Sequence, residues 1–295
     1  MTGFIQPTLL VHGGAGRIRE FDRPHYEAGL RQALTGGYEA LAESAEAAVL
    51  KAVKVMEDNP VAFNAGTGGA PNRNGIVECD ACIMCSDGSS GAVASLTRAK
   101  NPVLVAEQVR RGSPHAFIVG LGADALVDDP IPNSELLTER SQEQLKRWRA
   151  KGGTPEGSAT VGAVALDATG RLAAATSTGG LLGKWPGRVG DAPVVGAGTY
   201  ADTQVAVSCT GAGEAFLRAV AAKTLALRLD ERGLASCLEL ALIDVENCGG
   251  DGGLITVTAD GQIGFGWNTP HLAYGYKTAL IEVAKVGLEA GITVI

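Results

Sequence analysis

A short segment of small and polar residues divides this chain into two halves of different character. The segment KGGTPEGSA, residues 151–159, is rich in glycine and interrupted by proline, a composition typical of exposed, mobile linkers. Directly after it, TVGAVALD (160–167) and RLAAATST (171–178) alternate around a turn at 168–170, as the strands of a β-hairpin do. Any fold must therefore place a strand immediately behind a flexible connection, with Thr160 as its first residue.

Composition and charge exclude several classes of protein. Glycine accounts for 41 of the 295 residues, about twice the usual share of roughly 7%, and aromatic residues make up only 5%. The core must therefore be built from Ala, Val, Leu and Ile, in sheets that approach closely. The net charge of −7 argues against nucleic acid or an anionic membrane as partner. No window reaches the roughly 18 apolar residues of a membrane helix.

The N-terminal sequence and the cysteines indicate a compartment. The start, MTGFIQPTLLVHGG, has no basic segment followed by an apolar one, so no signal peptide is evident. Six cysteines are too sparse in this length for a disulfide scaffold. We therefore expect a cytoplasmic protein.

Hydrophobic periodicity predicts strands followed by helices, without strict βα alternation. Besides the hairpin, we expect strands at 8–12, 76–84, 90–96, 116–120, 194–198 and 205–209, and a second hairpin at 253–267. We expect helices at 24–36, 43–57, 102–111, 134–150, 211–229 and 234–246. The tail 277–295 is ambiguous between helix and strand. This order predicts a layered α+β fold with a largely antiparallel sheet. The long Asn-, Gly- and Pro-rich loop at 58–75 is of a length that is usually functional.

Three familiar kinds of site are not supported. The nearest approach to a G-x-S-x-G serine motif is GSSG at 88–91, one residue short, and His12 is interpreted as a packed, hydrogen-bonded ring. The cysteines of VECDACIMC (77–85) lie three apart on a predicted strand, so their side chains cannot converge on a metal. The GxGxxA at 196–201 precedes a strand pattern at 203–210, where a dinucleotide fingerprint needs a helix.

Thr160 remains as a candidate nucleophile. A threonine hydroxyl needs a base, and cleavage of the chain before Thr160 would expose an α-amine with a pKa of roughly 7.7–8.0 on the same residue. The β-methyl would restrict the direction of attack. A purely structural role remains open, because Ser and Thr often begin strands.

Several blocks, taken together, resemble the plant-type asparaginase family, also called isoaspartyl peptidases, of the N-terminal-nucleophile hydrolases. The resemblance covers nearly the whole chain. In order, the blocks are VHGGAG (11–16), FNAGTG (63–68), ECDACIM (78–84), TVGAVALD (160–167), AAATSTGG (173–180), PGRVGDAP (186–193), VAVSCTGAGE (205–214) and GGDGGLI (249–255).

The resemblance implies a four-layer αββα sandwich made as a precursor. Self-cleavage between Ala159 and Thr160 would give an α subunit, residues 1–159, and a β subunit, residues 160–295. These would assemble as an (αβ)2 heterotetramer. The implied activity is hydrolysis of L-asparagine or isoaspartyl dipeptides, through a β-aspartyl ester of Thr160, with no cofactor for the chemistry.

The resemblance also assigns catalytic residues. Thr160 is similar to the family's nucleophile, and Thr178 to the threonine that hydrogen-bonds it. Thr210 and Gly211 match the donors to the oxyanion, a hydroxyl and a backbone N–H. Asn64 matches an asparagine close to the nucleophile.

Three further residues match the family's substrate contacts. Arg188 would bind the α-carboxylate through its planar guanidinium. Asp191 would receive the α-ammonium, and the backbone of Gly213 would add a contact.

The loop after residue 55 resembles the family's sodium loop, in which backbone carbonyls bind Na⁺. It carries one residue more than usual between Asn59 and Phe63. The expected ligands are the carbonyl oxygens of Met56, Glu57, Asn59, Phe63, Ala65 and Thr67.

Two other departures concern cleavage and substrate. Ala159 stands where the family usually has Gly or Asp, so we expect slower self-cleavage. In WNTPHLAYGY (267–276), Trp267 and His271 depart from the usual Phe-Asn-Thr block near the expected substrate mouth. Two alternatives remain open. One is a glycosylasparaginase, against which the absent signal peptide and Ala159 argue, and the other is an uncleaved, non-catalytic binding or assembly protein.

Overall fold

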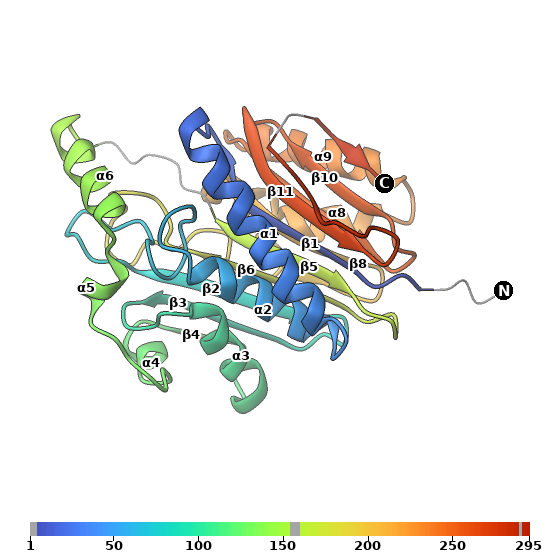
Figure 1. The fold of residues 1–295 in the computed structure, drawn as a ribbon, viewed down its shortest axis with the longest axis horizontal. Helices are drawn as coiled ribbons and strands as arrows, with labels where there is room; N and C mark the ends of the chain where they lie inside the picture. Colours follow the sequence, from blue (N-terminus) through green and yellow to red (C-terminus); the bar gives the residue numbers. More distant parts are fainter. Residues whose placement is uncertain (1–4, 154–159, 289–290) are drawn as a thin grey trace.

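The computed structural model describes residues 5–153, 160–288 and 291–295 (Figure 1). Its strands form one eight-stranded sheet, in the order β12-β11-β1-β5-β6-β2-β3-β4, and one five-stranded sheet, in the order β13-β10-β9-β8-β7. The strands of the first sheet are β1 (Thr8–Gly16), β2 (Cys79–Cys85), β3 (Ser90–Leu96), β4 (Phe117–Val119), β5 (Val161–Leu166), β6 (Leu172–Thr178), β11 (His271–Thr278) and β12 (Lys285–Gly287). The strands of the second are β7 (Thr199–Ala201), β8 (Val205–Gly211), β9 (Gly252–Thr258), β10 (Ile263–Trp267) and β13 (Thr293–Val294).

Helices lie against both sheets. The α1, α2 and α3 helices contact the eight-stranded sheet, α8 and α9 contact the five-stranded sheet, and β1 and β5 of one sheet contact β9 and β8 of the other (Figure 1). The helices are η1 (Glu20–Asp22), α1 (Arg23–Ala40), α2 (Ala45–Glu57), α3 (Pro102–Gly112), α4 (Leu121–Asp124), α5 (Asn133–Leu136), α6 (Glu139–Ala150), α7 (Gly213–Ala219), α8 (Ala221–Arg228) and α9 (Leu234–Asn247). The expectation of a mixed α+β protein is confirmed, and the named strand pairs are antiparallel except β3 with β4.

Two apolar cores follow from this arrangement, and they fix the direction of the β5 side chains. Ala163 and Ala165 belong to the core between the helices and the first sheet, whereas Val164 and Leu166 belong to the core shared with the second sheet. Because side chains alternate along a strand, Gly162 and Thr160 face the second sheet. The start of β5 is thereby aimed between the two sheets.

The helix α2 shows how the sequence produces one of these layers. Ser44 caps its first turn by accepting a hydrogen bond from Ala47 N at 3.1 Å, as N-cap residues do. Its apolar residues then recur at helical spacing and are buried against β5 and β6. These are Ala45, Ala48, Val49, Ala52, Val53 and Met56.

Two helices predicted as continuous are interrupted. The segment 134–150 forms α5 and α6, because Thr138 starts a new helix by a capping box with Ser141. The segment 211–229 forms α7 and α8, separated by Val220 at φ 47°, a left-handed conformation that breaks a helix.

Two strand predictions also need correction, and the ambiguous tail is resolved as strand. Residues 194–198 form a turn containing Gly196 at φ 90°, and the strand β7 follows it. The first strand does not stop at residue 12 but continues to Gly16 through a bulge. The ambiguous tail contains the end of β11, then β12 and β13.

The contact between α3 and β3 gives a direct test of packing. A Cβ on Gly91 would lie 2.2 Å from Ala106 O and 2.5 Å from Arg110 N, both in the helix backbone. We expect Gly91→Ala to lower the free energy of unfolding by about 1–3 kcal/mol, because the helix must move away from the strand. Urea denaturation measures this. Gly112→Ala is the matched control, with nothing within 4 Å of its added Cβ, and equal losses in both variants would contradict the packing argument.

Candidate active site

Thr160 lies at the start of β5, buried between the sheets, with 5% of its surface exposed. Its hydroxyl donates to Thr178 Oγ1 at 3.1 Å, and Gly180 N donates to the same oxygen at 3.0 Å. Thr178 ends β6, the neighbour of β5 in the sheet. The structure therefore brings the expected nucleophile and its expected partner together.

Asn64 holds the turn that follows Thr178. Its Nδ2 donates to Gly180 O at 2.8 Å, its backbone oxygen accepts from Gly179 N at 2.9 Å, and its Oδ1 accepts from Ala70 N at 2.5 Å. The Asn64 side chain thus binds the long loop to the turn beside the nucleophile. Among the described residues, its hydrogen bonds go to that turn and to Ala70 of its own loop, and none goes to the Thr160 hydroxyl.

Thr210 lies at the same end of the two sheets. Ala15 N, at the end of β1, donates to Thr210 Oγ1 at 3.3 Å. Since β1 runs antiparallel to β5 and pairs His12 with Gly162, residues beyond His12 lie toward Thr160. A hydroxyl that accepts from Ala15 N keeps its own proton for another acceptor, as an oxyanion donor requires.

Gly211 follows Thr210 in a conformation that only glycine adopts readily. Its φ is +147°, and a Cβ there would lie 2.3 Å from Asp251 O. The absence of a side chain lets the chain turn from β8 into α7 and leaves this backbone segment accessible at the site.

Arg188, Asp191 and Gly213 also converge. A Cβ on Gly213 would lie 2.8 Å from Arg188 Nη2 and 3.0 Å from Asp191 Oδ1, so glycine leaves room between the two charged groups. Burial raises the pKa of Asp191 to about 7, an effect that Arg188 opposes. Asp191 Oδ2 is buried without a hydrogen-bond partner among the described residues, as expected of a group that receives a ligand.

Two residues of this cluster were not predicted from the sequence. Glu214 binds the side edge of the Arg188 guanidinium, with distances of 2.9 Å to Nε and 2.7 Å to Nη2. Lys184, fully buried, donates from Nζ to Glu78 O at 2.7 Å, while Gly187 N donates to Glu78 Oε1 at 3.0 Å. These contacts hold the loop that carries Arg188. Both residues were missed because their partners are distant in the sequence, and local sequence patterns do not reveal such pairs.

The proposed sodium loop closes on itself through two of its expected ligand carbonyls. Met56 O accepts from Asn59 N at 3.2 Å, and Glu57 O accepts from Thr67 N at 3.0 Å. A carbonyl oxygen has two lone pairs, so Glu57 O, with this one donor, retains a lone pair for a cation. Phe63 is fully buried and Ala65 is buried beside it, which fixes the backbone between them.

Burial raises the pKa of Glu57 to about 8. Hydrogen bonds from Ser177, Val103 and Asn101 oppose that rise. The rise therefore reflects the loss of water around this buried carboxyl group.

The two residues expected at the substrate mouth lie in different sheets, His271 at the start of β11 and Trp267 at the end of β10. His271 pairs with Gly16, and its Nδ1 accepts from Ile18 N at 3.2 Å while its Nε2 lies 3.3 Å from Arg23 Nη2. Trp267 is buried, and its ring packs at a tilt of 41° against Tyr274, with ring centroids 5.6 Å apart. Ala159 and most of the linker lie outside the described residues.

The structure also shows where the cysteines and the GxGxxA segment lie. All six cysteines are free thiols, and Cys82 faces away from the core that holds Cys79 and Cys85. In the part of the chain that the structure describes, no cluster of His, Cys, Asp and Glu could hold a metal. A strand, β8, follows the GxGxxA segment. Of the described helices, none has the length and apolarity to span a bilayer.

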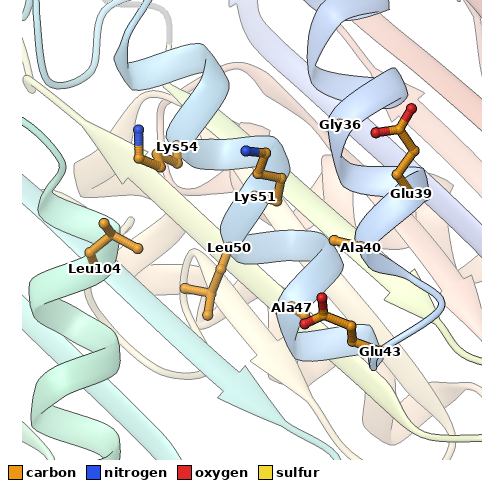
Figure 2. Close-up of a pocket in the computed structure, with 9 residues that line it drawn as sticks. All are labelled: Gly36, Glu39, Ala40, Glu43, Ala47, Leu50, Lys51, Lys54 and Leu104. Carbon is orange, nitrogen blue, oxygen red and sulfur yellow. The ribbon is translucent and has the colours of Figure 1, made fainter.

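A surface hollow lies elsewhere, between α1, α2 and the start of α3 (Figure 2). It is lined by charged, small and leucine side chains of these helices, including Glu39, Lys51 and Lys54, and by Glu43 in the turn between α1 and α2. None of its lining residues belongs to the Thr160 cluster, and it faces away from the second sheet. It is therefore not the candidate active site.

The sequence of this chain is similar to those of known proteins over most of its length. Residues 5–284 match a family model described as asparaginase. The isoaspartyl peptidase of Escherichia coli (strain K12) is 40% identical, over 91% of this chain and 92% of that protein. The plant-type L-asparaginase of Pyrococcus horikoshii is 38% identical, over 95% and 99%. The isoaspartyl peptidase/L-asparaginase of Mus musculus is 40% identical, over 98% and 91%.

The raised pKa of Asp191 predicts that this residue makes the free energy of unfolding depend on pH. Its pKa is higher in the folded protein than in the unfolded chain, so the folded state binds more protons between pH 4 and 7 and loses stability as pH rises through that range. We expect Asp191→Asn to gain stability relative to the unsubstituted protein by on the order of 1–3 kcal/mol from pH 5 to pH 8. Denaturation at both values measures it, and a pH-independent difference would contradict the assignment.

Proposed function

We propose, from the premise that this chain belongs to the asparaginase family, that it hydrolyses L-asparagine and isoaspartyl dipeptides with Thr160 as nucleophile. The observation that carries the proposal is the position of Thr160. Its hydroxyl is bonded to Thr178 at the end of the sheets where Thr210 lies. The loop after Thr210 leads to the cluster of Arg188, Asp191 and Gly213.

The proposal includes the family's architecture and maturation. Helices on the outer faces of two sheets that contact each other support a four-layer αββα sandwich. Cleavage before Thr160 would divide it into residues 1–159 and 160–295 without removing a strand of either sheet. The (αβ)2 assembly and a cytoplasmic location are part of the proposal by family resemblance and remain to be measured.

The nucleophilic step uses both groups of the new N-terminus. The α-amine of Thr160 accepts the hydroxyl proton as Oγ1 attacks the side-chain carbonyl carbon of the substrate. Thr178 orients the hydroxyl by accepting its hydrogen bond in the resting state. The C–N bond then breaks, the amine returns the proton to the leaving ammonia or amino acid, and a β-aspartyl ester remains on Thr160. Water hydrolyses the ester and releases aspartate.

The negative oxygen of the tetrahedral intermediate needs donors that are already in place. The Thr210 hydroxyl, oriented by Ala15 N, and the Gly211 N–H would supply them. Neither has to reorganise during the reaction, because Thr210 is fully buried and Gly211 is confined by Asp251.

The α-amino and α-carboxylate groups of the substrate would bind the charged cluster. Glu214 occupies the side edge of the Arg188 guanidinium, which leaves the Nη1–Nη2 edge for the α-carboxylate. Asp191 would receive the α-ammonium, and that cation would favour the ionised carboxylate against the effect of burial.

Two alternative functions are distinguished by simple assays. A glycosylasparaginase would release a glycan from glycosyl-asparagine, and the reported relatives carry asparaginase and isoaspartyl peptidase names instead. An uncleaved binding protein would remain a single chain. No observation on the site favours either.

We also propose that Na⁺ binds the loop at 56–67, held by the carbonyl oxygens named for it above. The ion would fix the loop that carries Asn64, and through Asn64 the turn after Thr178. It takes no part in bond breaking.

Cleavage is the first test. Purified protein should separate into two fragments on denaturing mass spectrometry, and Edman sequencing of the second should read TVGAV. Thr160→Ala should remain one chain and lose hydrolysis of asparagine and β-aspartyl dipeptides by at least about 1,000-fold. Thr169→Ala, in the β5–β6 turn, is the matched control and should cleave and turn over normally. Full activity in Thr160→Ala would refute the mechanism.

Sodium binding predicts an ion-dependent stability. We expect the unfolding temperature to be at least about 2 °C higher in NaCl than in choline chloride at equal ionic strength, because an ion that binds only the folded state stabilises it. Differential scanning fluorimetry measures this, with LiCl and KCl as tests of ion selectivity. Identical unfolding temperatures in all four salts would refute a cation site.

A further inference from the structure

Two hydrogen-bond donors face each other beside the candidate active site, with no acceptor between them. His271 Nδ1 is 3.2 Å from the backbone nitrogen of Ile18, and Nε2 of the same ring is 3.3 Å from Arg23 Nη2. Both neighbours can only donate, whereas an imidazole ring always carries at least one N–H. One of the two contacts therefore brings donor against donor.

The mismatch lies at Arg23. The N–H of Ile18 is fixed in direction by the backbone, so Nδ1 accepts from it and the ring proton lies on Nε2. Nε2–H then faces the guanidinium of Arg23, which is the first residue of α1. Glu20 Oε2 lies 3.2 Å from Arg23 Nε, on the other side of that guanidinium. An anionic oxygen placed to accept from both Nε2–H and Nη2–H would resolve the mismatch.

This donor pair is close to the groups proposed to react. His271 pairs with Gly16 at the end of β1, and the residue before Gly16 is Ala15, whose N–H donates to Thr210 Oγ1. A Cβ on Gly16 would meet nothing within 4 Å, so the strand end between His271 and Thr210 is open. The donor pair therefore borders the strand end that orients the proposed oxyanion donor.

The donor pair and the Arg188 cluster lie on opposite sides of Thr160. In the eight-stranded sheet, β11 and β1 flank β5 on one side, and β6 and β2 flank it on the other (Figure 1). The Arg188 loop follows β6 and is held through Gly187 to Glu78, directly before β2. Because these neighbouring strands are antiparallel, the start of β11 is at the same end of the sheet as Thr160.

An isoaspartyl dipeptide has charged groups on both sides of the bond that is cut. Its α-amino and α-carboxylate groups lie on one side of the reacting carbonyl, and the leaving amino acid, with a carboxylate of its own, lies on the other. With the first two groups at Arg188 and Asp191, the leaving amino acid extends past Thr160 toward β1 and β11. L-Asparagine releases only ammonia and has no group that reaches there.

We propose that Arg23 and His271 bind the carboxylate of the leaving amino acid and so favour β-aspartyl dipeptides over L-asparagine. The carboxylate accepts from His271 Nε2–H and from Arg23 Nη2–H, the two donors that face each other in its absence. This inference rests on the proposed function and adds no step to its mechanism. Since neither residue touches the bond that breaks, the contact acts on dipeptide binding.

The first measurement uses the unsubstituted protein with three substrates: β-aspartyl-leucine, its C-terminal amide, and L-asparagine. The amide keeps the shape of the leaving residue but removes its negative charge. We expect KM to be about 10-fold higher for the amide than for the acid, because a charge-assisted hydrogen-bond pair is lost.

Two substitutions assign that preference to the donor pair. Arg23→Gln removes the cation, and His271→Asn removes Nε2–H while its side-chain oxygen can still accept from Ile18 N. We expect each to raise KM for β-aspartyl-leucine by about 5–10-fold, to bring KM for acid and amide within about twofold, and to leave L-asparagine hydrolysis within about twofold. Arg31→Gln is the matched control, because Arg31 is exposed about two turns further along α1 and donates to Ala284 O.

Comparing acid with amide in each variant cancels the intrinsic difference in reactivity of the two dipeptides. An unchanged preference for the acid in either variant, the same change in Arg31→Gln, or an equal loss on L-asparagine would overturn the inference. If neither variant folds, the unsubstituted protein still decides, since a KM for the amide equal to or below that for the acid refutes a carboxylate site.

Failure of the proposed function gives a different result. The unsubstituted protein would then hydrolyse neither L-asparagine nor β-aspartyl-leucine. Hydrolysis of L-asparagine without hydrolysis of the dipeptide would overturn the carboxylate site alone and leave the Thr160 mechanism standing.

Discussion

The close approach of the two sheets at Gly162 is the constraint on which the site depends. With a side chain at this position, Ser208 could not reach His12 and Thr176, and the sheets would separate behind Thr160. Alanine and glycine are frequent along the facing strands, so the approach is not confined to one point. A composition poor in aromatic residues is thus the condition for placing polar groups from both sheets within hydrogen-bond distance.

The site is built from both sides of the proposed cut. Asn64, Glu78 and Ala15, which precede the cut, bond to Gly180, Lys184 and Thr210, which follow it. Because β1 also pairs with β5 along its length, the two halves share one sheet. Breaking a single peptide bond before Thr160 would therefore leave the architecture intact while freeing the one amine that the chemistry requires.

Features that depend on neighbouring residues could be predicted from the sequence, whereas contacts between distant segments could not. The strand beginning at Thr160, the hairpin to Thr178 and the α2 stripe follow from local alternation and were predicted with nearly the observed bounds. The break at Thr138 has a local signal, a capping box with Ser141, that was not used. Glu214 on Arg188 and Lys184 on Glu78 have no local signal, because each joins segments that only the folded chain brings together.

The roles that the sequence suggested for individual residues have a similar limit, because they too depend on contacts that only the folded chain makes. Asn64 was expected close to the nucleophile, and its hydrogen bonds join Ala70 of its own loop to the turn after Thr178. His12 was interpreted as a packed ring, and burial and its bond to Ser208 agree with that. What the sequence could not show is that the ring reaches Ser208 of the other sheet, since this depends on the register of β1 with β5 and on the absent side chain of Gly162.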